Sequence, residues 1–254
     1  MVIGVYVDDL LVGGSEEDCK LLLSSLKKKF STNDLGECTW YDGCGIERDT
    51  ELGTITMSQE AYVESLMTRF DVQTTCDTPA SPRAVLGPKR DDEPRGDWPV
   101  REAVGSLLWL STMTRPDMTN AERAAARYAH APTARLWESV MQILSYLKGT
   151  KNVGITDVRG SGLGLEVYAD ADYADKANDK SSVSGIEVTL GGTVVNHASK
   201  TQHVVWLSTS EAEYIAAGDG VKEALFVRAV CLSLHPRRSG QLSRSLRTTR
   251  GLRR

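Results

Sequence analysis

The chain has 254 residues, of which 41% are hydrophobic and 25% charged, as is typical of soluble globular proteins with one or two domains. It contains no run of 18 apolar residues and no cleavable signal, so the sequence predicts neither a membrane span nor secretion. The five cysteines form no CxxC pair and have no histidines at zinc spacing, which predicts free thiols in a reducing, intracellular compartment.

The net charge of −4 conceals an asymmetry. Residues 236–254 hold seven arginines and no acid, whereas the rest of the chain has 23 basic and 34 acidic side chains. An acidic body disfavours strong non-specific DNA binding, because phosphates repel it.

Elements of both types are predicted before residue 71. Residues 4–14, GVYVDDLLVGG, predict two strands joined by a tight turn, and residues 15–30 predict a helix capped by Ser15. Alternation over residues 45–58 predicts a hairpin. The helix that follows is expected to be capped by Ser58.

Residues 71–99 are rich in proline and polar side chains, with little periodicity, and predict a linker. Three helical stretches are predicted next, over residues 100–113, about 117–130 and 133–148. Pro132 precedes the third stretch and favours its start there.

After these helical stretches, apolar residues recur at every second position, as in a β-strand. Alternation over residues 163–170 predicts a strand with one apolar face, and residues 184–199 predict a hairpin through Gly191-Gly192. Residues 203–208, HVVWLS, predict a further strand, and residues 208–234 a helix. The fold class predicted for the whole chain is α+β or α/β.

Asp8 and Asp9 lie inside an apolar run, where an ionised carboxylate is costly unless it is paired. Carboxylates at a hairpin tip are suitable ligands for Mg²⁺, and two such ions across a phosphate stabilise the attacking and leaving oxygens. The other interpretation is an acidic, solvent-exposed turn.

A succession of motifs decides between them. In chain order, the motifs are YVDDLLVGG, KKFSTNDLGE, GIERD, TMSQEAYVESLMTRF, TPASP, VGSLLWLSTMTRPDM, LSYLKGTKNVGI, YADADYADKANDKSSVSG and LSTSEAEYIAA. This succession resembles the Pol polyprotein of Ty1/copia-type LTR retrotransposons over roughly residues 2–235.

The resemblance implies a domain order. Residues 1–70 would be the C-terminal part of a reverse transcriptase palm and the following region, and residues 71–99 a linker. Residues 100–150 would be a helical connection, and residues 158–235 an incomplete RNase H-like domain. Residues 236–254 would be a basic tail.

By the same resemblance, Asp8 and Asp9 match the paired aspartates of the polymerase site. The third aspartate of that site would lie upstream of residue 1, and two acids without it cannot hold both metals. We therefore expect a polymerase remnant, inactive alone.

The resemblance makes Asp170 and Glu211 the first two RNase H metal ligands, with Asp172 a weaker candidate. Ser208-x-x-Glu211 is also a capping box, and the two roles are compatible. Glu213 is expected at the surface. His197 and His203 are expected on strands without binding metal.

Two further features suggest decay. Gly218 and Gly220 interrupt a predicted helix, each at a cost of up to about 1 kcal/mol relative to alanine. The family continues with a strand carrying EDNQG, and its aspartate is the third ligand. Read one base later, GAG-GAC-AAC-CAG-GG encodes Arg-Thr-Thr-Arg, the residues found at 247–250. A frameshifted tail would lack both the strand and the ligand.

The predicted function is a fragment of a retrotransposon RNA-directed DNA polymerase and ribonuclease H. Its cofactor would be Mg²⁺ or Mn²⁺. Its partners would be RNA template, RNA–DNA hybrid and the rest of Pol, in a cytoplasmic virus-like particle or the nucleus, with no membrane. Two alternatives remain: a non-catalytic nucleic-acid-binding module that uses the tail arginines, or a wrongly delimited exon of a longer active polyprotein.

Overall fold

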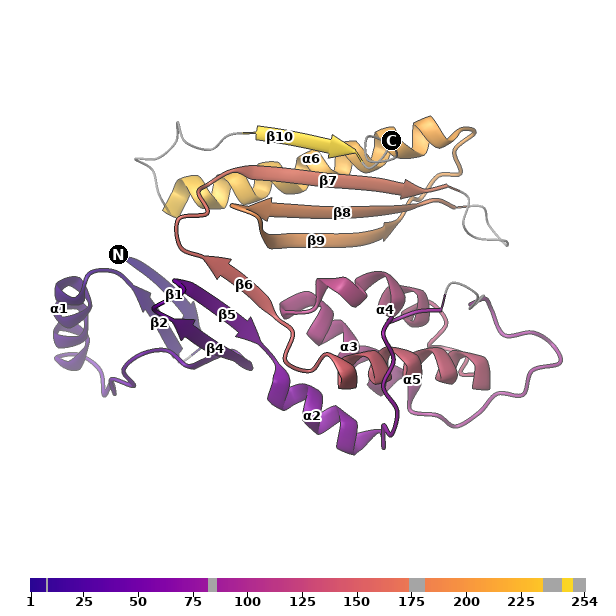
Figure 1. Ribbon diagram of the computed structural model, residues 1–254, viewed down its shortest axis with the longest axis horizontal. Helices are drawn as coiled ribbons and strands as arrows, with labels where there is room; N and C mark the ends of the chain where they lie inside the picture. Colours follow the sequence, from indigo (N-terminus) through magenta and orange to yellow (C-terminus); the bar gives the residue numbers. More distant parts are fainter. Residues whose placement is uncertain (8, 82–85, 174–180, 235–243, 249–254) are drawn as a thin grey trace.

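The computed structural model describes residues 1–7, 9–81, 86–173, 181–234 and 244–248 (Figure 1). Within these ranges the chain forms three small sheets and a group of helices, so it mixes α and β structure. None of the helices in the described part combines the length and apolarity needed to cross a bilayer.

The N-terminal hairpin has the predicted form. Strands β1 (Val2–Tyr6) and β2 (Asp9–Gly13) pair antiparallel, with Tyr6 opposite Asp9. Helix α1 (Glu16–Lys27) follows, and the Ser15 side chain accepts a hydrogen bond from the Asp18 backbone N–H, as the capping pattern predicted.

The second sheet has the order β3-β4-β5-β6. It contains β3 (Trp40–Tyr41), β4 (Cys44–Asp49), β5 (Thr54–Ser58) and β6 (Ile155–Val158). The predicted hairpin is β4–β5, and Gly53 has the positive φ of 67° that its turn requires. Strand β6 was not predicted. It pairs with β5 from about a hundred residues further along the chain and ties the second sheet to the helices that precede it.

Four helices and a short 3₁₀ turn form the helical unit, which contains the main core. They are α2 (Glu60–Arg69), α3 (Val100–Met113), η1 (Pro116–Met118), α4 (Thr119–Ala126) and α5 (Ala134–Gly149). Their apolar faces share one buried cluster, which includes Leu66, Leu107, Leu110 and Leu144. The predicted Ser58 cap is wrong, because Ser58 ends β5 and Gln59 precedes α2 without a side-chain capping bond.

Residues 71–99 contain no helix or strand in the parts that the structure describes, but they lie against the helices. Val72 is buried, and Leu86 and Trp98 pack on the core. Glu93 forms an ion pair with Arg135 of α5 at 2.9 Å. The predicted linker therefore packs closely along the helical unit.

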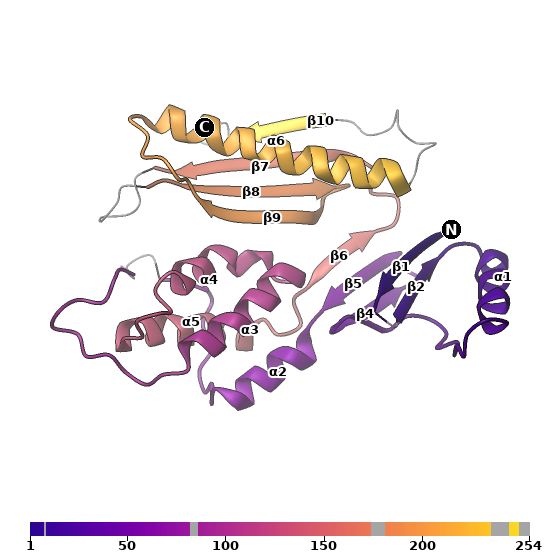
Figure 2. The same cartoon turned by 180° about the vertical axis from the view of Figure 1, so that it is seen from behind.

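The third sheet has the order β10-β7-β8-β9. Strands β7 (Leu165–Asp172), β8 (Val183–Leu190) and β9 (Thr193–Thr201) form an antiparallel meander, and the predicted Gly191-Gly192 turn joins the last two. Helix α6 (Thr209–Leu234) covers one face of this sheet, and the β9 edge lies toward α4 (Figures 1 and 2).

Gly220 has a packing role that the sequence did not reveal. A Cβ at this position would lie 3.0 Å from Val167 Cγ1 and 3.5 Å from Ala169 Cβ, so the glycine lets α6 approach β7 closely. Gly218 has open space around its Cα. The interpretation of both glycines as decay is therefore wrong for Gly220.

Two predictions about strands are also wrong. Residues 203–207 form an irregular connection, so His203 is on no strand. Strand β9, which ends this edge of the third sheet, instead contacts α4 and β6. Conversely, the tail does supply a strand. Strand β10 (Arg244–Thr248) pairs parallel with β7, because an open edge accepts the backbone of any extended segment.

Candidate functional site

The N-terminal aspartates were predicted at the tip of the β1–β2 hairpin. Asp8 lies outside the described residues, and Asp9 is exposed at the start of β2. Val7, in the turn before them, has a left-handed φ of 49°. The neighbouring Val5 and Tyr6 are also exposed, so the apolar burial that would penalise an unpaired acid is absent here.

The acids of β7 stand at the end of a well-packed strand. Leu165, Val167 and Ala169 are buried toward α6, as the alternation predicted. Asp170 and Asp172 are exposed and, by the same alternation, lie on the opposite face of the strand. Their exposure leaves both carboxylates within reach of solvent ions.

Helix α6 begins at the same end of the sheet. Gln202 Nε2 donates to Ser184 Oγ and to the Ala212 backbone oxygen, both at 2.9 Å. Ser184 pairs with Ala171, the residue after Asp170. The buried Gln202 side chain therefore fixes the first turn of α6 level with the end of β7.

Glu211 forms the predicted capping box. Its Oε2 accepts hydrogen bonds from the backbone N–H groups of Leu207 (2.9 Å) and Ser208 (3.1 Å), and Ser208 Oγ accepts from the Glu211 N–H (3.3 Å). Both carboxylate bonds use Oε2. Oε1 takes no part in the box.

Glu213 was expected at the surface, yet it is only partly exposed. It precedes Gly220 by seven residues, close to two helical turns, so the two residues share one side of α6. Since Gly220 lies against Val167 and Ala169, that side faces β7. In the sequence, the seven-residue spacing between Glu213 and Gly220 was the signal that could have predicted that Glu213 faces β7.

The carboxylates near the end of β7 are of the type that Mg²⁺ binds. Mg²⁺ keeps several waters and binds through one or two carboxylates, a number that Asp170 and one glutamate of α6 can supply. In the described ranges no three His, Cys, Asp or Glu side chains are grouped closely enough to hold a metal.

Strand β10 brings the tail next to this end of the sheet. Its parallel register places Arg247 beside Tyr168 and Thr248 beside Ala169, the residue before Asp170.

The comparisons with known proteins agree with the resemblance. The family described as reverse transcriptase (RNA-dependent DNA polymerase) matches residues 1–84. The Pol polyprotein of transposon TNT 1-94 from Nicotiana tabacum is 33% identical over 90% of the chain. That of transposon RE1 from Arabidopsis thaliana is 33% identical over 91%. The chain covers only 18% and 16% of these two polyproteins. No solved structure matches it.

A shorter relative is covered for most of its length. The putative transposon Ty5-1 protein of Saccharomyces cerevisiae is 30% identical over 225 residues, which are 87% of this chain and 73% of that protein. The mixed fold and these matches define a retroelement polymerase fragment. The chain belongs to the copia-type retrotransposon Pol polyprotein family.

Proposed function

We propose that the chain runs from the end of a reverse transcriptase palm, through a helical connection, into an RNase H-like domain formed by β7 to β10 and α6. The observation that carries this proposal is the arrangement of the third sheet. Three antiparallel strands are followed by a long helix and by a strand parallel to β7. The family resemblance likewise implies a helix that begins near Glu211 and a strand after that helix.

In this proposal the substrate is the RNA strand of an RNA–DNA hybrid. A Mg²⁺ ion, when bound, would polarise the scissile phosphate and lower the pKa of an attacking water. Asp170, with Glu211 or Glu213, would hold it.

We further propose that the chain by itself neither extends a primer nor cuts hybrid efficiently. The β1–β2 hairpin exposes its apolar side chains, so nothing in the described residues holds Asp9 rigidly. In this proposal, the tail residues next to Ala169 stand where an intact relative would have its third carboxylate. A frameshift across residues 236–254 accounts for that replacement.

The partners follow from this assignment. RNA template, RNA–DNA hybrid and the remainder of Pol are the proposed partners, and the exposed hairpin is the surface that the remainder of Pol would cover. The proposed locations are the cytoplasmic virus-like particle or the nucleus.

Hybrid cleavage tests the RNase H assignment. We expect little or no Mg²⁺-dependent cleavage by the chain as it stands. We expect recovery when the reading frame is restored across residues 236–254, which would return the EDNQG aspartate, and is extended through the fourth ligand that the family resemblance implies further downstream. The recovered activity should disappear in Asp170→Asn. Comparing Glu211→Gln with Glu213→Gln in that background identifies which glutamate binds the metal.

The same comparison defines failure. A repaired protein that folds and binds hybrid but never cuts would refute the RNase H-like assignment. Cleavage that survives Asp170→Asn and both glutamate variants would refute the residue assignments.

Primer extension tests the polymerase part separately. On a primed RNA template with Mg²⁺ or Mn²⁺ we expect no extension. Extension that is abolished by Asp8→Asn would show that the hairpin carries a working site and would overturn this part of the proposal.

A further inference from the structure

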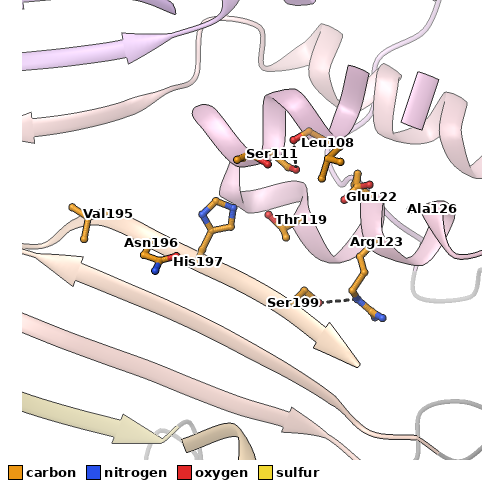
Figure 3. Close-up of a pocket in the computed structure, with 11 residues that line it drawn as sticks. Leu108, Ser111, Thr119, Glu122, Arg123, Ala126, Val195, Asn196, His197 and Ser199 are labelled. Atoms are coloured by element: carbon orange, nitrogen blue, oxygen red, sulfur yellow. Dashed lines mark hydrogen bonds between the residues drawn. The ribbon is translucent and has the colours of Figure 1, made fainter. Parts of the chain in front are cut away.

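A cavity of about 430 Å³ lies between α3, α4 and the outer strand β9, away from the acids of β7 (Figure 3). The cavity lies at the contact between the helical unit and the third sheet. Its polar lining includes Ser111, Thr119, Glu122, Asn196, His197 and Ser199, and its apolar lining includes Leu108, Ala126 and Val195.

Glu122 is the unusual residue of this cavity. The residue is only 4% exposed, and it forms no hydrogen bond or salt bridge with any residue in the described ranges. Burial raises the pKa of its carboxyl group to about 7. The hydroxyl oxygen of Thr119, one turn earlier on α4, is also buried with no partner among the described residues. These two polar groups of one cavity therefore lack hydrogen-bond partners among the described residues.

The basic side chains near Glu122 form hydrogen bonds with residues other than Glu122. Arg123 lowers the pKa of Glu122 through its charge, but its guanidinium donates to Ser199 Oγ (2.9 Å), Thr201 Oγ1 (3.2 Å) and Asn120 Oδ1 (3.1 Å). His197 hydrogen-bonds the Ser111 backbone. Burial lowers the pKa of His197, although the charges of Glu187 and Asp117 oppose this shift. The imidazole is therefore neutral near pH 7.

We propose that this cavity binds a primary ammonium group carried on a short alkyl chain. The ammonium would donate to the Glu122 carboxylate and the Thr119 hydroxyl, supplying both the missing donors and a compensating charge. Leu108, Ala126 and Val195 would contact the methylene groups. A free polyamine and a lysine side chain both present this chemistry.

Calorimetric titration of the full chain with n-butylamine at pH 8 tests the site. We expect saturable binding that weakens at least tenfold in Glu122→Gln and is unchanged in Glu138→Gln. Glu138 is an exposed glutamate of α5 outside the cavity. Putrescine and N-acetyl-lysine methylamide are the two further probes, and the tighter of them identifies the source of the ammonium group.

Three outcomes would overturn the proposal. These are no saturable binding at tens of millimolar, equal binding by Glu122→Gln, and equal binding of n-butanol, which would show only a non-specific apolar cavity. Loss of binding in Glu122→Gln cannot be attributed to unfolding if the free energy of unfolding of the variant is at least as large as that of the parent chain. We expect that stability, because glutamine carries no buried charge.

Discussion

Asp9 of the β1–β2 hairpin and Asp170 of strand β7 are both exposed acids near a strand end, but of these two strands only β7 is packed against a helix. Behind Asp170, Leu165 and Ala169 are buried under α6. Beside Asp9, Val5 is 69% exposed. A carboxylate can be held in a fixed geometry only where a second layer packs behind its strand, so the same sequence pattern predicts a site in one region and an unsupported turn in the other.

Removing the packing behind Asp170 should have the largest effect on the free energy of unfolding. Leu165→Ala deletes a side chain that is 4% exposed, and we expect a loss of about 2–5 kcal/mol in unfolding free energy. Val5→Ala in the hairpin should change it by no more than about 0.5 kcal/mol. Urea denaturation of both variants measures the contrast, and similar losses would show that the hairpin is as well packed as the sheet.

The stability of the fold should depend on pH through Glu122, which lies between the third sheet and the helical unit. Its folded-state pKa of about 7 lies above the ordinary 4.5, so ionisation destabilises the fold. The associated stability is present below pH 4.5 and lost as pH rises through 7. Glu122→Gln should therefore be more stable than the parent by up to about 3 kcal/mol at pH 8.

Measuring unfolding at pH 4 and pH 8 checks the sign. The advantage of Glu122→Gln should shrink toward zero at pH 4, where the parent carboxyl is also neutral. In the control Glu138→Gln we expect no such trend. A constant difference at both pH values would mean that Glu122 is not buried as an unpaired acid.

The two glycines of α6 should respond in opposite directions. Gly218→Ala should stabilise by about 1 kcal/mol, since alanine favours a helix and the position is open. Gly220→Ala should cost about 1 kcal/mol, because its Cβ would press on Val167. Thermal unfolding of the pair checks this, and a gain from both would show that α6 can move away from β7.

Much of the fold could be predicted from local pattern. The hairpins and helices α1 to α6 follow from periodicity, turns and caps that lie within each segment. Strand β6 could not be predicted, because its partner β5 is about a hundred residues away. The apolar run at 203–207 predicted a strand, but a strand also needs a free sheet edge, and local sequence does not record one.

The candidate site was less predictable for a related reason. Asp170 followed from alternation and resemblance, and the capping box from spacing. The approach of Glu213 to β7 depends on how closely α6 packs, which Gly220 decides. The cavity at Glu122 combines residues from three elements, and no single segment carries its pattern.

The smallest expected effect is stabilisation by metal, and it separates the two acidic regions without any catalytic assay. Ligand that binds only the folded state stabilises it by RT ln(1 + [L]/Kd), so a millimolar site in a few-fold excess of Mg²⁺ should add about 0.5–1 kcal/mol. We expect this increment in the parent chain, measured as the change in unfolding free energy on adding MgCl₂ at constant ionic strength. It should be lost in Asp170→Asn and retained in Asp9→Asn, because only Asp170 stands on a packed strand next to the first turn of α6. An increment lost in Asp9→Asn instead would place the metal at the hairpin and reverse the comparison.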